Sequence, residues 1–132
     1  RLLSRGLGDV YKRQDLLNID RNPQILRLLG LIEFDEKNYD GSLKLFNESL
    51  QINPNDSECY SNRGVVNFKL KNVQEAISDY KKAISIDKNN YNAFFNLGNL
   101  YKEINKLDES IENLNEAIKI NKNFYNAFII EL

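Results

Sequence analysis

The chain has 132 residues, of which 42% are hydrophobic and 28% are charged, and its formal net charge is −1. This composition is ordinary for a globular protein. The sequence contains no His, no Met and no Trp, and Cys59 is its single cysteine. A single cysteine excludes an internal disulfide framework, and no group of residues has the spacing of a structural zinc site. We therefore expect Cys59 to be an unreactive helix residue in a reducing, cytoplasmic compartment.

The first fourteen residues, RLLSRGLGDVYKRQ, differ from the rest of the chain. Residues 4–14 resemble the in-frame translation of a transposase adapter used in sequencing libraries. We interpret residues 1–14 as a non-native, adapter-derived segment and exclude them from the fold. Removing their four basic residues and one acidic residue leaves 14 basic and 18 acidic residues, a net charge of −4. This mildly acidic balance disfavours nucleic-acid binding, which needs concentrated Lys and Arg.

The remaining sequence repeats itself every thirty-four positions. Glycines recur at Gly30, Gly64 and Gly98, and two further rows of small residues keep the same spacing. These rows are Ser42, Ala76 and Ser110, and Ser49, Ala83 and Ala117. Such a period is the signature of stacked repeat architectures. Because one helical hairpin cannot bury its apolar face alone, we expect the units to stack, with the small residues allowing close helix contact.

Apolar residues inside each unit follow helical spacing. The third unit, for example, has Phe94, Leu97, Leu100 and Tyr101 at positions i, i+3, i+6 and i+7. The pattern predicts six helices, near residues 24–36, 40–52, 57–70, 74–86, 91–104 and 108–120.

Two helix starts carry capping signals. Asn22 before Pro23 is typical of an N-cap followed by proline in the first turn. Asn72, with Glu75 three residues later, predicts a capping box.

A family resemblance rests on the third unit. Residues 93–101, AFFNLGNLY, resemble the first helix of a tetratricopeptide repeat, and Ser110, Leu114 and Ala117 match that family's small, aromatic and small positions. Pro54 stands at the family's closing proline. The resemblance implies an all-α fold, a right-handed α-solenoid of stacked antiparallel helical hairpins. It also implies three full repeats, at 23–56, 57–90 and 91–124, between the end of one truncated repeat (15–22) and the start of another (125–132).

The first two units depart from the family pattern in places. Arg63 replaces the usual leucine before Gly64, while Glu33 and Asn67 replace the tyrosine represented by Tyr101. We therefore expect the second unit to pack less tightly. An RNA-reading helical repeat that is one residue longer is the nearest alternative fold, and both the observed period and the acidic charge disfavour it.

Nothing in the sequence indicates catalysis. There is no histidine for acid–base work, no phosphate-binding glycine motif and no metalloprotease motif. Glu109 and Glu112 fall on a polar helix face and are expected to be solvated. We expect no catalytic residue, no cofactor and no metal in this fragment, whereas a catalytic domain elsewhere on a longer chain stays open. No run approaches the ~20 apolar residues that cross a bilayer, so membranes, like nucleic acids, are not expected partners.

The resemblance instead implies a binding surface on the concave side of the solenoid, lined by the first helix of each unit. The expected partner is a protein or an extended peptide. Helical phase assigns the following residues to this groove: Gln24, Arg27, Leu28, Leu31, Glu58, Ser61, Asn62, Val65, Asn92, Phe95, Asn96, Asn99 and Lys102.

One known use of such a groove is expected to be absent. Some relatives grip a C-terminal carboxylate of heat-shock chaperones with Lys, Asn and Arg. Arg27 matches the first of these positions, but Leu31, Asn92 and Asn96 stand where the family needs Asn, Lys and Arg.

A second known use matches in part. Asn62 and Asn96 resemble the asparagine-lined superhelix attached to some O-linked N-acetylglucosamine transferases, whereas Leu28 and Ile130 do not. Because Asn is common throughout the chain, a chance match is an open alternative.

Three functions therefore remain at this stage. The first is a scaffold or adaptor that binds a peptide or partner protein in the groove. The second is the substrate-recruiting segment of a larger enzyme, such as a glycosyltransferase of the O-linked N-acetylglucosamine class. The third is a structural spacer that stacks on itself, and in each case the solenoid is expected to continue beyond both ends.

Overall fold

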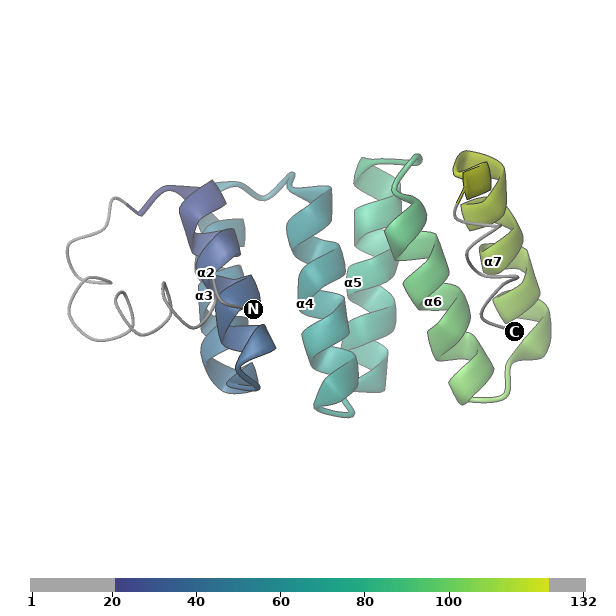
Figure 1. Cartoon of the computed structure of the whole chain (residues 1–132), viewed down its shortest axis with the longest axis horizontal. Helices are drawn as coiled ribbons and strands as arrows, with labels where there is room; N and C mark the ends of the chain where they lie inside the picture. Colours follow the sequence, from purple (N-terminus) through teal and green to yellow (C-terminus); the bar gives the residue numbers. More distant parts are fainter. Residues whose placement is uncertain (1–20, 124–132) are drawn as a thin grey trace.

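The computed structural model describes residues 21–123 and shows three helical hairpins in that range (Figure 1). The first hairpin pairs α2 (Pro23–Asp35) with α3 (Tyr39–Ile52), and the second pairs α4 (Ser57–Lys69) with α5 (Val73–Ile86). The third pairs α6 (Tyr91–Glu103) with α7 (Leu107–Ile120). Each predicted helix lies within one residue of its observed bounds, and the described residues contain no strand. The all-α solenoid expected from the sequence is confirmed. The interpretations of 1–14 and 125–132, and most of 15–22, lie outside the described residues.

Side-chain caps fix several helix starts. Asn22 accepts a hydrogen bond from the Gln24 N–H, with Pro23 in the first turn, as predicted. The capping box predicted at Asn72 is wrong. Asn72 occupies the N-cap position of α5 but makes no side-chain cap hydrogen bond. Its amide nitrogen donates to the Asn67 Oδ1 at 3.4 Å.

The turn inside each hairpin has one shape, repeated three times. Lys37, Lys71 and Asn105, which are equivalent positions of the three units, adopt left-handed backbone angles with φ of 65°, 65° and 62°. In each turn the following residue donates its N–H to a carbonyl five residues earlier, for example Asn72 to Asn67 at 2.8 Å. This arrangement closes the last turn of the first helix and reverses the chain.

The glycine row marks the closest approach of the two helices in each hairpin. A Cβ atom added at Gly64 would lie 2.6 Å from the Tyr80 ring, and one at Gly98 would lie 2.8 Å from the Leu114 side chain. The same contact joins Gly30 to Phe46 in the first hairpin. The close packing that the small-residue rows predict is therefore present in all three units.

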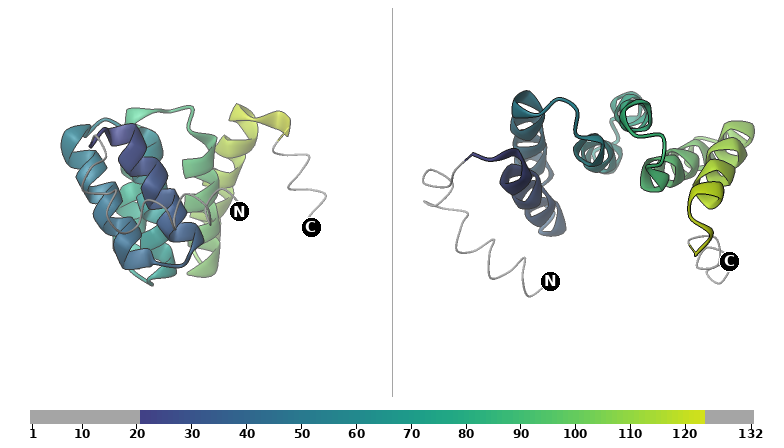
Figure 2. Two further views of the ribbon diagram at one scale, coloured as in Figure 1. Left: turned by 60° about the vertical axis from the view of Figure 1, so that its left-hand side comes forward. Right: turned by 90° about the horizontal axis from the view of Figure 1, so that it is seen from above.

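The hairpins stack with their first helices on the inner side of an arc (Figure 2). The first helices touch along the stack, since α2 contacts α4 and α4 contacts α6. By contrast, α3 has no direct backbone contact with α5, and α5 has none with α7. The first helices consequently form the concave face, and open spaces separate the second helices on the convex face.

Candidate functional site

The candidate groove residues fall into three exposure classes. Five of them are exposed, namely Gln24, Leu31, Glu58, Asn92 and Lys102, together with the neighbouring Leu28. Half-buried are Arg27, Asn62, Val65, Phe95, Asn96 and Asn99. Ser61, also expected in the groove, is 3% exposed and offers almost no surface to a ligand. Its side chain is short, and α4 is flanked by both α2 and α6 at this face.

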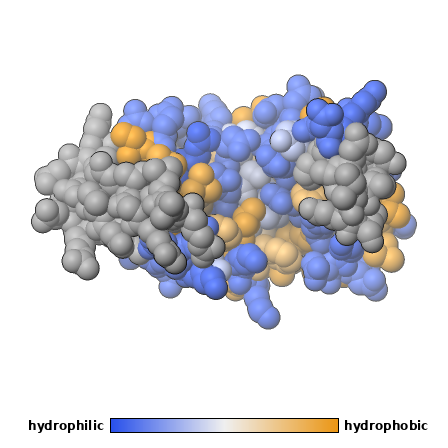
Figure 3. All heavy atoms as spheres, in the orientation of Figure 1, coloured by the Kyte–Doolittle hydropathy of each residue, from blue (hydrophilic) through white to orange (hydrophobic). Residues whose placement is uncertain are grey.

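The first unit gives the concave face an apolar character. Leu28 and Leu31 on α2 are 47% and 40% exposed, although both are large hydrophobic residues. Elsewhere the visible surface is mainly hydrophilic, with hydrophobic atoms gathered in smaller patches (Figure 3). Arg27 does not point freely into the groove, because its guanidinium lies 3.4 Å from the Asp56 carboxylate.

The two asparagines of the proposed ladder have no internal hydrogen-bond partner for their side chains among residues 21–123. Asn62 on α4 and Asn96 on α6 are half-buried, and neither side chain makes a hydrogen bond within the part of the chain that the structure describes. Both amides keep some access to solvent, because every fully buried side-chain N or O atom among the described residues has a hydrogen-bond partner. Both amides can therefore meet a donor or acceptor from outside. Ile130, the ladder position that does not match, lies outside the described residues.

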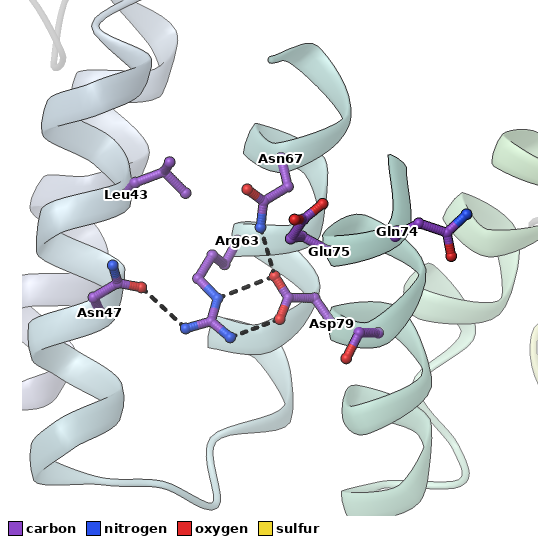
Figure 4. A pocket seen from close by; sticks show the side chains of 8 residues that line it. Leu43, Asn47, Arg63, Asn67, Gln74, Glu75 and Asp79 are labelled. Atoms are coloured by element: carbon purple, nitrogen blue, oxygen red, sulfur yellow. Dashed lines mark hydrogen bonds and ion pairs between the residues drawn. The ribbon is translucent and has the colours of Figure 1, made fainter. Parts of the chain in front are cut away.

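A second polar arrangement, which the sequence analysis missed, lies on the convex side (Figure 4). Arg63 donates from Nε and Nη2 to the two carboxylate oxygens of Asp79, at 3.0 and 2.7 Å. Its Nη1 donates to the Asn47 Oδ1 at 3.0 Å, and Asn67 donates to the Asp79 carboxylate at 2.9 Å. The network joins α3, α4 and α5 beside a depression of about 450 Å³.

Burial gives this network a structural role. Asp79 is 4% exposed and Asn67 is 8% exposed. The hydrogen bonds to Asp79 raise the pKa of Arg63 above its ordinary value, so the guanidinium is charged. Because both carboxylate oxygens of Asp79 already accept from fixed donors, no group of the network is poised to move a proton. The departures of the second unit are thus compensated by a bidentate ion pair, which the expectation of looser packing overlooked.

Cys59 behaves as expected from the sequence. It is fully buried, its Sγ lies 3.7 Å from the carbonyl oxygen of Phe46, and burial raises the pKa of its thiol to about 11. A thiol with this pKa is almost entirely protonated near neutral pH and is a poor nucleophile.

The described residues hold no cluster of three or more side chains able to bind a metal ion. None of the helices among residues 21–123 combines the length and apolar character needed to cross a membrane.

The three stacked hairpins define a helical-repeat fold. Sequence patterns of the tetratricopeptide repeat match residues 57–90 and 79–112, and a TPR repeat pattern matches residues 30–71. Together they span residues 30–112, more than half of the chain. The chain belongs to the tetratricopeptide repeat family. This membership supports a general role as a protein-interaction scaffold. No curated protein matches the sequence.

Solved structures share the fold. A crystal structure of MamA has a TM-score of 0.75 and 23% sequence identity, over 95% of this chain and 70% of MamA. The TPR domain of Arabidopsis OM64 has a TM-score of 0.74 and 21% identity, over 76% of this chain and 84% of that domain. A second crystal structure of MamA has a TM-score of 0.74 and 23% identity, over 95% of this chain and 66% of that one. At these identities the likeness shows the fold alone.

Proposed function

We propose that the concave face formed by α2, α4 and α6 holds an extended peptide or a segment of a partner protein. The observation that carries this proposal is the pair of unpaired amides of Asn62 and Asn96 on two helices that touch. A carboxamide offers both a donor and an acceptor, so one Asn side chain can pair with the N–H and C=O of a peptide backbone.

The spacing of the helices suits an extended ligand. Packed helices lie about 8–10 Å apart, and an extended peptide rises about 3.3 Å per residue. Asn62 and Asn96 would then contact the ligand backbone at about every third residue. Such contacts ignore the ligand's side chains, so the exposed Leu28 and Leu31 on α2 would supply a preference for an apolar residue.

The test uses a peptide selected by display against the full chain. We expect Asn62→Ala combined with Asn96→Ala to weaken its binding by about 2–6 kcal/mol, since the two amides would make four hydrogen bonds and each contributes about 0.5–1.5 kcal/mol. The circular dichroism of the helices should not change. Asn115→Ala, at an exposed position of α7 outside the groove, is the matched control and should bind the peptide normally. Unchanged affinity of the double variant would show that the asparagines do not hold the ligand.

A further inference from the structure

The convex face carries a second depression, between α5 and α7, which the groove function does not use. Its volume is about 370 Å³. The floor is apolar and comes from α5 and α6, with Ile84, Phe94 and Leu97 as its main residues. Leu97 is 2% exposed and belongs to the hydrophobic core of the second and third units, so this floor is rigidly supported.

The walls of this depression are acidic. Glu109, Glu112 and Glu116 line it from α7, and Lys81 lines it from α5, which gives three negative charges against one positive charge. Glu116 also pairs with the exposed Lys119 at 3.2 Å, whereas Glu109 and Glu112 have no partner for their carboxylates within residues 21–123. The sequence pattern predicts that Glu109 and Glu112 lie on a solvated helix face. They are exposed, and the structure also places them at one concave site.

A buried tyrosine lines the same site. Tyr101 is 7% exposed, and its hydroxyl makes no hydrogen bond within the described residues. The hydroxyl oxygen keeps some access to solvent, because every fully buried polar side-chain atom among these residues has a hydrogen-bond partner. A tyrosine hydroxyl can accept a hydrogen bond from a group placed beside it.

The second unit shows what such a depression can hold. Six lining positions of the α5–α7 depression stand exactly one repeat after lining positions of the depression between α3 and α5. In the earlier depression the chain supplies its own cation, because the Arg63 guanidinium lies against Asp79 and Asn47. In the later one Leu97 and Asn113 take the places of Arg63 and Asp79, so the equivalent space holds no guanidinium of the described chain. Its carboxylates come from Glu109, Glu112 and Glu116 instead.

We propose that the α5–α7 depression binds the arginine or lysine side chain of a partner protein. The aliphatic stem of that side chain lies on Ile84, Phe94 and Leu97, as long basic side chains do on apolar surfaces. Its charged head meets the carboxylates of Glu109 and Glu112 and donates to the Tyr101 hydroxyl. This surface lies on the opposite side of the solenoid from the groove of the proposed function, so the two can be occupied together.

The direct test is an NMR titration of the full chain with three short peptides. The peptides are acetyl-Gly-Arg-Gly-amide, acetyl-Gly-Lys-Gly-amide and the neutral acetyl-Gly-Gln-Gly-amide. We expect the two basic peptides to shift the backbone amide signals around Leu97, Tyr101 and Glu112, and the neutral peptide to leave them unchanged. Because the carboxylates are exposed, the shifts should shrink as salt rises from about 20 mM to about 500 mM.

Variants separate the two kinds of contact. Glu109→Gln combined with Glu112→Gln should raise the dissociation constant of the arginine peptide at least about fivefold, since charge-assisted hydrogen bonds are the stronger kind. Tyr101→Phe removes one hydroxyl and keeps the ring, and should raise it about twofold to tenfold. The matched control is Glu75→Gln, the position one repeat before Glu109, which should bind the peptide as the unchanged chain does.

Three results would overturn the proposal. The first is an equal response to the neutral peptide. The second is an arginine-peptide response confined to residues of the concave face, such as Asn62 and Asn96, which would leave the proposed function intact. The third is unchanged affinity in the Glu109 and Glu112 double variant.

Discussion

The second and third units have the same backbone and differ in what fills the space beside the first helix. In the second unit Arg63, Asn67 and Asp79 form a hydrogen-bonded network, and the equivalent positions of the third unit carry Leu97, Tyr101 and Asn113. The helical turns, the glycine contact and the helix lengths are nevertheless alike. The hairpin geometry therefore depends on the small-residue rows and the turns. The flanking positions can hold either apolar core residues or charged residues.

The two units also differ in where their charged side chains lie. The second unit neutralises Asp79 internally with Arg63. The third unit has no such internal cation at Leu97, and Glu109 and Glu112 face the open side of its depression. Two positions differ here, because Leu97 and Asn113 replace Arg63 and Asp79, so the third unit lacks both members of the buried ion pair.

The largest expected effect comes from breaking the network on one side. Asp79→Ala leaves the Arg63 guanidinium and the Asn67 amide without their acceptor. We expect the free energy of unfolding to fall by about 3 kcal/mol. This value is at the low end of the range for removing one member of a buried ion pair, because Arg63 is partly exposed. Urea denaturation followed by circular dichroism measures it. A loss below about 1 kcal/mol would mean that water replaces the carboxylate without penalty.

A smaller effect is expected from overfilling the hairpin contact of the third unit. Gly98→Leu places a side chain where a Cβ alone would lie 2.8 Å from the Leu114 side chain and 3.2 Å from its backbone nitrogen. We expect the free energy of unfolding to fall by about 1–3 kcal/mol. The same denaturation experiment reports it, with Asn99→Leu, the next residue of the same helix, as a control for adding leucine. An unchanged midpoint for Gly98→Leu would contradict the close contact.

The smallest effect is expected when the second unit is converted to the chemistry of the third. The triple variant Arg63→Leu, Asn67→Tyr, Asp79→Asn replaces the whole network by the residues found one repeat later. Well-packed apolar residues often stabilise a fold as much as a buried ion pair does, or more. The free energy of unfolding should therefore stay within about 1 kcal/mol of that of the unchanged chain, or increase. A loss as large as that of Asp79→Ala would show that the network is needed to hold α3, α4 and α5 together.

Much of the fold was predictable because its causes are local or periodic. The glycine and small-residue rows indicated the hairpin contacts, and apolar spacing placed each helix to within one residue. The capping box at Asn72 failed although its residue types are present. The contact between Asn72 and Asn67 does not explain the missing cap, because the equivalent Asn38 contacts Glu33 on the preceding helix and still caps α3.

The ion pair was predictable in principle but was missed. Arg63 was recognised as an oddity, yet its partner Asp79 was not considered. The repeat register contains the signal, since Leu29 and Leu45 occupy the equivalent positions of the first unit, and both change to opposite charges in the second. The exposure of the groove residues was harder to foresee. Helical phase predicts the direction in which the Ser61 side chain points. It does not predict how deeply the neighbouring helices bury so short a side chain.

Successive second helices have no direct contact, so the stack of hairpins is stiffer along its concave side than along its convex side. The first helices touch, so bending must occur mainly by opening or closing the spaces between α3, α5 and α7. Arg63 spans the first of these spaces, from Asp79 to Asn47, and limits how far it can widen. The space between α5 and α7 has no such tie among the described residues, so the curvature of the third unit against the second is the easier one to change.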